Sequence, residues 1–254
     1  MPGICRPRAY PQRSAMPALG ILMLQTRFPR PPGDIGHPRT FGFPTVRRVV
    51  PAATPARVVR GDDVALLAPF IAGARQLVDE GCAAIATSCG FLARWQRELQ
   101  AALPVPVWSS ALLQLAEAEA QGRRCGVITI EAASLGRPHF DGVGADPATP
   151  VEGIAPGSAL HRTLLQDLPT LDAQDARAQV LAAAERLCRR VPAIDTLLLE
   201  CTNLPPYADA LRAATGLPVL DVVTLLNANM ARLAGQPART GSGVVGGRGS
   251  GGRG

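Results

Sequence analysis

The stretch "LLLECTNLPPY" (residues 197–207) reads as a buried strand that runs into a cysteine and then into a turn. A second stretch, "AAIATSCGFLARW" (residues 83–95), also passes through small apolar residues to a cysteine before a helical pattern begins. Each stretch predicts a β-strand followed by a helix, with Cys201 or Cys89 at the junction. The surroundings of these two cysteines decide how the rest of the chain is interpreted.

The two stretches belong to an internal repeat. Each cysteine is followed 17 residues later by a Pro-Val pair that opens another short strand and a helix. Upstream, "GILM" (20–23) and "GVIT" (126–129) also correspond, lying 69 and 75 residues before their respective cysteines. The repeat predicts two similar lobes with a cysteine at the same place in each.

Strand-like apolar runs alternate with helical patterns along the chain, which favours parallel sheets with helices on both faces. The predicted strands are 19–24, 47–51, 82–87, 105–110, 125–130, 149–154, 195–200 and 218–223. The predicted helices are 62–80, 91–102, 110–121, 157–167, 172–190, 205–214 and 222–234. We therefore predict an α/β fold of two similar lobes, each a mostly parallel sheet flanked by helices, related by a pseudo-two-fold with the active site in the cleft between them.

The same patterns predict the domain boundaries. The first lobe comprises residues 17–109 plus 222–236 and carries Cys89, and the second comprises 110–221 and carries Cys201. Residues 1–16 lack periodicity and residues 237–254 are rich in Gly, Ser and Arg, so both ends are predicted to be disordered. Met16 directly precedes a core-like run and is a candidate translation start.

Composition excludes several classes of protein. The 254 residues are 47% hydrophobic, which provides an ample core, and no window holds the roughly eighteen uninterrupted apolar residues of a membrane helix. With no secretory signal, we predict a cytoplasmic protein without a membrane partner. The formal charge of +6 comes from the Arg-rich ends, whereas the body is mildly acidic, so we predict no nucleic-acid partner. A nucleic-acid role would require binding that disappears when both ends are removed.

The residues present also narrow the chemistry. All 26 basic residues are Arg, and a chain without Lys cannot form the Schiff base of pyridoxal phosphate enzymes of the usual kind. The six cysteines form no CxxC pair, and the three histidines have no partner at metal-ligand spacing, so we predict no metal site. Of the cysteines, Cys82, Cys125 and Cys188 lie in core-like runs and are interpreted as buried hydrophobic residues.

Cys89 and Cys201 fit a different role, because each follows the carboxyl end of a parallel strand, where ligands bind in open sheets. Two thiols that face one cavity from opposite sides can invert a stereocentre, one taking a proton and the other returning one to the opposite face. A position at the start of a helix predicts a lowered thiol pKa for each cysteine.

The motifs "TSCG" (87–90), "ECTN" (200–203) and "GILMLQTRFPRPPGDIGHP" (20–38) resemble the cofactor-independent aspartate/glutamate/hydantoin racemase superfamily over about residues 17–236. The stretch "LLLECTNLPPYADALRAATGLPVLDVVTLLN" (197–227) is similar to a branch grouped with aspartate/glutamate racemases. The resemblance implies that Cys89 and Cys201 are the acid/base pair of a racemase or epimerase acting on an amino acid or a related acidic C–H compound. It implies no cofactor, and it also implies a homo-oligomer.

The departures from the family concern the substrate. Gly90-Phe91 stand where amino-acid racemases have Asn-Thr, and Gln25-Thr26 replace an early Asp-Ser. Thr202 is retained, whereas Asn203 replaces the usual His. The alternatives are therefore a hydantoin racemase, a maleate isomerase, an arylmalonate decarboxylase or an inactive small-molecule binding protein. Cys89 speaks against the decarboxylase, because that branch lacks the first thiol.

The predicted partner is a small molecule of carboxylate type. Backbone N–H groups beside a glycine suit a carboxylate or a developing enolate oxygen. The long Pro-rich segment 27–44 is predicted to cover the cleft, its arginines being either carboxylate ligands or simply solvated. Helix capping is the alternative role for Thr202 and Asn203. The candidate substrate-binding residues are Gln25, Thr26, Arg27, Ser88, Gly90, Phe91, Thr202 and Asn203.

Overall fold

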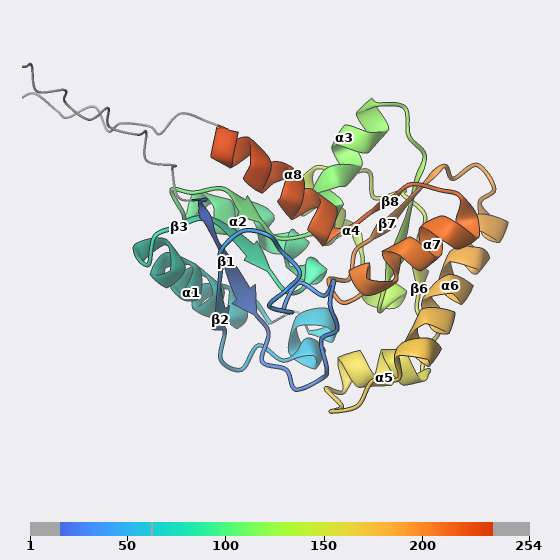
Figure 1. The fold of residues 1–254 in the computed structure, drawn as a ribbon, viewed down its shortest axis with the longest axis horizontal. Coiled ribbons are helices and arrows are strands. Elements are labelled where there is room, and N and C mark those ends of the chain that lie inside the picture. The colour runs from blue at the N-terminus through green and yellow to red at the C-terminus, as the bar shows by residue number, and fades with distance from the viewer. Residues whose placement is uncertain (1–15, 62, 236–254) are drawn as a thin grey trace, which may run out of the picture.

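Two four-stranded parallel sheets, one in each half of the chain, organise the structure (Figure 1). The computed structural model describes residues 16–61 and 63–235. The first sheet has the order β2-β1-β3-β4, and the second has the order β6-β5-β7-β8. The strands are β1 Ala18–Met23, β2 Thr45–Val49, β3 Cys82–Thr87, β4 Val107–Trp108, β5 Cys125–Thr129, β6 Val151–Gly153, β7 Thr196–Leu199 and β8 Val219–Leu220.

The identical order of the two sheets confirms the repeat and the predicted α/β class. Every neighbouring pair of strands is parallel. The "GILM" and "GVIT" stretches lie in β1 and β5, which are internal strands at the same position of each sheet. All residues of β5 and β7 are buried, as parallel strands covered on both faces must be.

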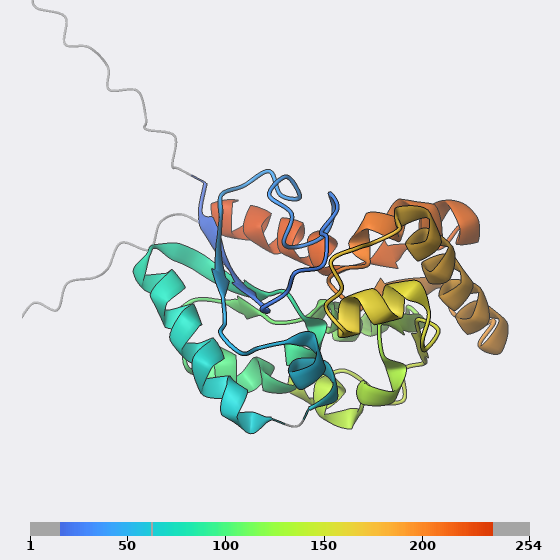
Figure 2. The same ribbon diagram turned by 90° about the horizontal axis from the view of Figure 1, so that it is seen from below.

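In the part of the chain that the structure describes, eight α-helices connect the strands and cover the sheets (Figures 1 and 2). They are α1 Leu67–Asp79, α2 Gln96–Ala101, α3 Leu115–Ala120, α4 Arg137–Val143, α5 Ala159–Leu165, α6 Ala173–Arg190, α7 Ala208–Thr215 and α8 Val222–Gly235. Short 3₁₀ segments precede several of them, at Val64–Leu66, Gly90–Trp95, Ala111–Gln114, Ala132–Ser134 and Pro205–Tyr207, and a π-helical turn spans Ala56–Arg60.

A pair of equivalent glycines allows a helix to pack closely on each internal strand. A Cβ at Gly20 of β1 would lie 2.8 Å from Ile85 Cδ1 and 3.0 Å from Leu77 of α1. A Cβ at Gly126 of β5 would lie 2.6 Å from Ile194 Cδ1 and 2.9 Å from Leu187 of α6. These contacts are tighter than side-chain packing allows, so the repeat preserves a close helix–sheet approach in both halves.

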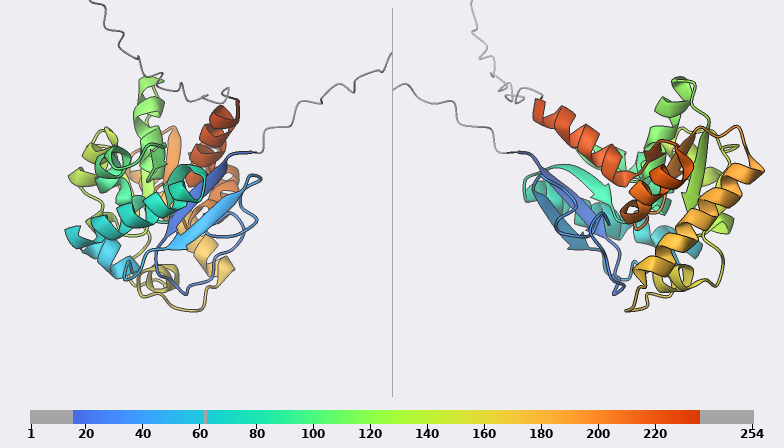
Figure 3. Two further views of the ribbon diagram at one scale, coloured as in Figure 1. Left: turned by 90° about the vertical axis from the view of Figure 1, so that its left-hand side faces the viewer. Right: turned by 45° about the vertical axis from the view of Figure 1, so that its right-hand side comes forward.

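The last helix, α8, runs from the end of β8 back beside the first half of the chain (Figures 1 and 2). Figure 3 shows the first sheet and α6 on opposite sides of the molecule. The lobe boundaries themselves stay predictions. The predicted disordered ends lie outside the described residues, apart from Met16, which is exposed.

Candidate active site

Cys89 lies at the carboxyl end of β3, in the first half of the chain. The strand ends at Thr87, whose hydroxyl lies 2.6 Å from the carbonyl oxygen of Ser109 and 3.0 Å from that of Cys89. Cys89 still has an extended backbone, with φ −152°, and the 3₁₀ helix Gly90–Trp95 begins at the next residue. The strand and the buried threonine therefore fix the direction in which the Cys89 side chain leaves the sheet.

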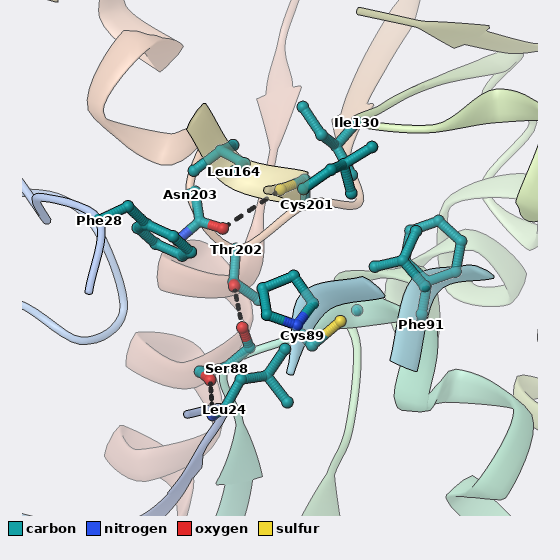
Figure 4. A pocket seen from close by; sticks show the side chains of 14 residues that line it. Leu24, Phe28, Ser88, Cys89, Phe91, Ile130, Leu164, Cys201, Thr202 and Asn203 are labelled. Carbon is teal, nitrogen blue, oxygen red and sulfur yellow. Dashed lines mark hydrogen bonds between the residues drawn. The ribbon is translucent and has the colours of Figure 1, made fainter. Parts of the chain in front are cut away.

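Cys201 lies at the equivalent end of β7, in the second half. Its thiol donates a hydrogen bond to Asn203 Oδ1, with an S···O distance of 3.6 Å (Figure 4). Asn203 Nδ2 in turn donates to Asp34 Oδ2 at 2.6 Å, and Asp34 lies in the segment after β1. Asn203 is thus held on both sides, and it orients the thiol rather than capping a helix.

Both thiols line one cavity (Figure 4). Ser88, Gly90, Phe91, Thr202 and Asn203, five of the eight predicted substrate-binding residues, line it as well. The cavity has a volume of about 20 Å³, enough for about one water molecule. The remaining lining residues are apolar, namely Leu24, Phe28, Pro55, Val59, Ile130, Leu164 and Leu165.

The short polar side chains at and near the cavity form hydrogen bonds, and that of Thr202 joins the two halves. The Thr202 hydroxyl donates to the carbonyl oxygen of Ser88 at 2.7 Å, and the backbone N–H of Leu24 donates to Ser88 Oγ at 2.8 Å. Ser110 accepts from the N–H of Leu112 at 3.2 Å and so caps the next 3₁₀ turn. Ser88 and Thr202 therefore have structural partners in addition to their place beside the cavity.

The expectation of a lowered thiol pKa was wrong for both cysteines. Burial raises the pKa of the Cys89 thiol, and the nearby charge of Glu200 raises it further. Burial and Glu200 also raise the pKa of Cys201 well above its ordinary value. The N–H group of Phe91 lowers the pKa of Cys89 and that of Asn203 lowers the pKa of Cys201, but burial outweighs both.

Gln25, Thr26 and Arg27 lie after β1 but do not line the cavity. Gln25 Oε1 accepts a hydrogen bond of 2.9 Å from the N–H of Ala52, and Thr26 Oγ1 accepts one of 3.0 Å from Arg30. The Arg27 side chain is 76% exposed and pairs with Asp167 at 3.2 Å. Their role as substrate ligands stays a prediction, and the structure places the next residue, Phe28, at the cavity instead.

The segment 27–44 lies against the second half as a cover. The N–H of Ile35 donates to the carbonyl oxygen of Thr202 at 3.4 Å. Arg30 pairs with buried Asp34 at 2.8 Å, and its guanidinium lies 4.6 Å from the centre of the Phe28 ring. The N–H groups of Arg27 and Phe28 both donate to Asp167 Oδ1. These contacts hold Phe28 at the wall of the cavity.

A second bridge crosses between the halves near the cavity wall. Arg60 Nη2 lies 2.6 Å from Glu131 Oε2, and His161 Nε2 lies 3.3 Å from the same oxygen. Glu131 directly follows Ile130, and Arg60 follows Val59, both of which line the cavity. The Arg60 contacts lower the pKa of Glu131 against the effect of burial.

Glu200 is the functional candidate that the sequence analysis missed. It directly precedes Cys201 and is fully buried, with Oε2 accepting a hydrogen bond of 2.6 Å from Thr129 Oγ1. The sequence signal was present, because an acid ends the apolar run "LLLE" at a position that the fold must bury. By contrast, no pattern in the sequence indicated that Phe28, Leu164 and Leu165 line the cavity.

The described residues contain neither a metal-binding cluster nor a membrane-spanning helix. Within 16–61 and 63–235, no group of three or more His, Cys, Asp or Glu side chains is arranged to hold a metal ion. None of the helices in that part of the chain combines the length and the hydropathy that crossing a membrane requires.

The two parallel sheets and the cavity lined by one thiol from each half define an α/β protein built from duplicated halves. The family model described as Asp/Glu/Hydantoin racemase matches residues 46–229, and this chain belongs to that family. The predicted resemblance is therefore confirmed at the level of the family.

Curated relatives that are about 30% identical to this chain are named as lyases rather than as racemases. The chain is 32% identical over 244 residues to dimethylsulfoniopropionate lyase 6 of Emiliania huxleyi (strain CCMP1516), an alignment covering 87% of this chain and 61% of that protein. It is 29% identical over 242 residues to lyase 5 of the same organism, covering 84% of this chain and 45% of the relative. The chain thus spans about half of the length of these relatives.

A solved structure supports the fold. Arylmalonate decarboxylase superposes with a TM-score of 0.58 at 17% identity, covering 87% of this chain and 94% of that chain. At this identity the likeness concerns the arrangement of strands and helices.

Proposed function

We propose that this chain is an enzyme in which a thiolate, of Cys89 or Cys201, removes a proton from the carbon next to the carboxylate of a small substrate. The observation that carries this proposal is the meeting of two thiols, from equivalent strand ends of the two halves, in one cavity. The cavity has room for only about one water molecule, so a charge that develops there interacts strongly with the few polar groups present.

We infer that the carbanion then loses a leaving group from the neighbouring carbon, an elimination that is compatible with the name of the lyases of similar sequence. With dimethylsulfoniopropionate as substrate, the thiolate takes the α-proton and the C–H electron pair forms the new C=C bond. The C–S bond breaks with its electron pair remaining on sulfur, which gives acrylate and neutral dimethyl sulfide. The cysteine becomes a thiol and returns its proton to solvent, so atoms and charge balance.

The lining of the cavity suits such a substrate. The Phe91 ring supplies apolar surface and a π face, which attracts a methylated cation, and the Phe28 ring, which already binds Arg30, adds apolar surface. Backbone N–H groups at the start of the 3₁₀ helix after Cys89 are candidates for the carboxylate or the enolate oxygen. Since the cavity is small, a substrate enters only when the cover formed by Phe28, Leu164 and Leu165 moves.

Racemisation of an amino acid or a hydantoin is the second candidate. It is favoured by the placement of one thiol in each half, because inversion needs an acid and a base on opposite faces of the substrate, whereas elimination needs only one base. An inactive binding protein with the same fold is the non-enzymatic alternative.

The deciding experiment offers both kinds of substrate to the same protein. Dimethylsulfoniopropionate is incubated with the enzyme, dimethyl sulfide is measured by headspace gas chromatography, and acrylate is measured by NMR. In parallel, α-proton exchange in D₂O is followed for aspartate, glutamate, substituted hydantoins and arylmalonates. Dimethyl sulfide released together with equal acrylate supports the lyase.

Cysteine variants assign the base. Cys89→Ser and Cys201→Ser are compared with Cys188→Ser, whose half-buried thiol lies on α6 away from the cavity. Loss of a catalytic base lowers kcat by roughly 10²- to 10⁴-fold, whereas Cys188→Ser should leave it unchanged. Exchange with inversion that needs both thiols would establish racemisation instead, and inertness toward every compound would overturn both activities.

A further inference from the structure

The buried carboxyl of Glu200 is held by only one of its two oxygens. Its side chain has no exposed surface, and Oε2 accepts the hydrogen bond from Thr129, the last residue of β5. Oε1 has no hydrogen-bond partner among the described residues. Burying an acid with one oxygen unpaired costs free energy, so a purely structural role would favour a neutral residue at this place.

The unpaired oxygen faces the chain segment that carries the other thiol. A Cβ at Gly90 would lie 2.2 Å from Glu200 Oε1 and 2.3 Å from the Glu200 carbonyl oxygen. Gly90 directly follows Cys89, and Glu200 directly precedes Cys201. The carboxyl group therefore lies between the two cysteine-bearing turns, and only a glycine at position 90 leaves room for it.

The internal repeat shows what this position holds in the other half. The N–H of Ser88 donates to the carbonyl oxygen of Leu22, and the N–H of Glu200 donates to that of Ile128, both at 2.9 Å. Leu22 and Ile128 are counterparts in "GILM" and "GVIT". The first half thus places a small hydroxyl where the second half places an acid, so the fold itself does not require a carboxylate there.

Two further charged side chains shift the pKa of a thiol, and these two side chains form an ion pair with each other. Arg30 lowers the pKa of Cys89 and Asp34 raises that of Cys201, and these two residues form an ion pair of 2.8 Å. Glu200 raises the pKa of both thiols. In the described part of the chain no cationic side chain forms an ion pair with Glu200.

We propose that Glu200 is a positioning residue that shares one negative charge with the two thiols, so that a thiolate forms only when Glu200 is protonated. In this exchange a thiol loses its proton and sulfur keeps the electron pair, while the carboxylate gains a proton, so the charge of the site stays at −1. An ionised Glu200 keeps both thiols protonated. The inference deepens the proposed function, because it specifies how the base of that reaction is made available.

The coupling has a measurable signature. Burial raises the pKa of Glu200 to about 7, although Thr129 opposes the shift. Below that pH the thiolate fraction should rise tenfold per pH unit. Above it, each further loss of a proton comes from Glu200, which suppresses the thiolate, so the fraction should level off.

The test measures alkylation by iodoacetamide between pH 5.5 and 9, with the sites resolved by peptide mass spectrometry. No substrate is needed, so the outcome is independent of whether dimethylsulfoniopropionate is turned over. Slopes are compared rather than absolute rates, because Cys89 and Cys201 are only 8% and 7% exposed. Cys125 is the internal control, since its pKa of about 11 is set by burial, Glu119 and Asp195.

We expect the rates at Cys89 and Cys201 to break near pH 7 in the wild type and in Glu200→Asp. In Glu200→Gln the break should vanish, and the rates should keep rising tenfold per pH unit, as Cys125 does in all three proteins. A wild-type profile without a break, or a break that survives in Glu200→Gln, would overturn the proposal.

A second variant covers the case in which Glu200→Gln does not fold. Thr129→Val removes the hydrogen bond that lowers the pKa of Glu200 and keeps the carboxyl in place. The break should then move to higher pH at both cysteines. An unmoved break in folded Thr129→Val would also contradict the role of Glu200.

Discussion

The Thr202 hydroxyl donates a hydrogen bond of 2.7 Å to the carbonyl oxygen of Ser88. Thr202 directly follows one cysteine of the cavity and Ser88 directly precedes the other. Both residues are buried, at 1% and 3% exposed. The Thr202 side chain therefore ties the turn that carries Cys201 to the turn that carries Cys89.

Thr202→Val should weaken both folding and catalysis. Valine keeps the shape but leaves the buried Ser88 carbonyl without this donor, which costs about 1–3 kcal/mol of unfolding free energy. Urea denaturation measures the loss, and kcat measures the effect on the thiols. Thr202→Ser keeps the donor and lacks only the methyl group, so it is the matched control. If Thr202→Val were as stable and as active as Thr202→Ser, the hydrogen bond would not have the role given to it here.

Asp167→Ala should loosen the cover over the cavity. Asp167 has φ +55°, an uncommon backbone conformation for a residue other than glycine, and its carboxylate accepts from the N–H groups of Arg27 and Phe28. Without it, Phe28 should leave the cavity more often, so iodoacetamide should alkylate Cys89 and Cys201 faster. The rate of alkylation is followed at fixed pH.

Arg27→Ala provides the control for the cover. It removes the ion pair with Asp167 but keeps both backbone hydrogen bonds, and an exposed pair contributes only about 0–1 kcal/mol. Its alkylation rate should stay close to that of the wild type. If Arg27→Ala exposes the thiols as much as Asp167→Ala does, then the ion pair, rather than the backbone contacts, holds the cover.

The fold could be predicted because its internal strands β1, β3, β5 and β7 are almost entirely buried and therefore appear as continuous apolar runs. The repeated cysteines, together with the stretches that begin at Gly20 and Gly126, indicated that the chain contains two similar halves. The two sheets indeed have the same strand order. α4 (Arg137–Val143) was missed, because its seven residues include Pro138 and Gly142, which are typical of turns.

The site was predictable only where it lies on strand ends. Cys89, Cys201 and their neighbours follow β3 and β7, and parallel strands bring such ends together. The cover comes from Phe28 in a long loop and from α5, and no local pattern shows which loop folds over which strand end. The thiol pKa was also misjudged, since burial among distant residues outweighs the local helix start.

Gly90→Ala should disable the site while leaving most of the fold intact. The added Cβ would overlap both the side chain and the backbone of Glu200, so the turn after Cys89 must move. Overpacking of this kind costs typically 1–3 kcal/mol, about what the unfolding free energy should lose. Gly42→Ala is the control, because a Cβ added there would meet no atom within 4 Å. Unchanged kcat in Gly90→Ala would contradict the close packing of Glu200 against this turn.

The stability of the protein should fall between about pH 4.5 and 7 because of Glu200. Burial raises its pKa from the ordinary 4.5 to about 7, so the folded state binds a proton that the unfolded state has already released. The contribution to stability is fully present below pH 4.5 and is lost as the pH rises through 7. At about 1.4 kcal/mol per pKa unit, the loss reaches at most roughly 3 kcal/mol.

Glu200→Gln isolates this contribution from the other titrating groups. Asp221 is also buried with a raised pKa, so the wild type alone reports a mixture. Urea denaturation of both proteins at pH 5 and pH 8 gives the difference in unfolding free energy at each pH. The unfolding free energy of the glutamine variant should increase relative to that of the wild type as the pH rises, because the variant carries no buried charge at position 200 at pH 8. A difference that is the same at both pH values would mean that Glu200 ionises with an ordinary pKa in the folded protein.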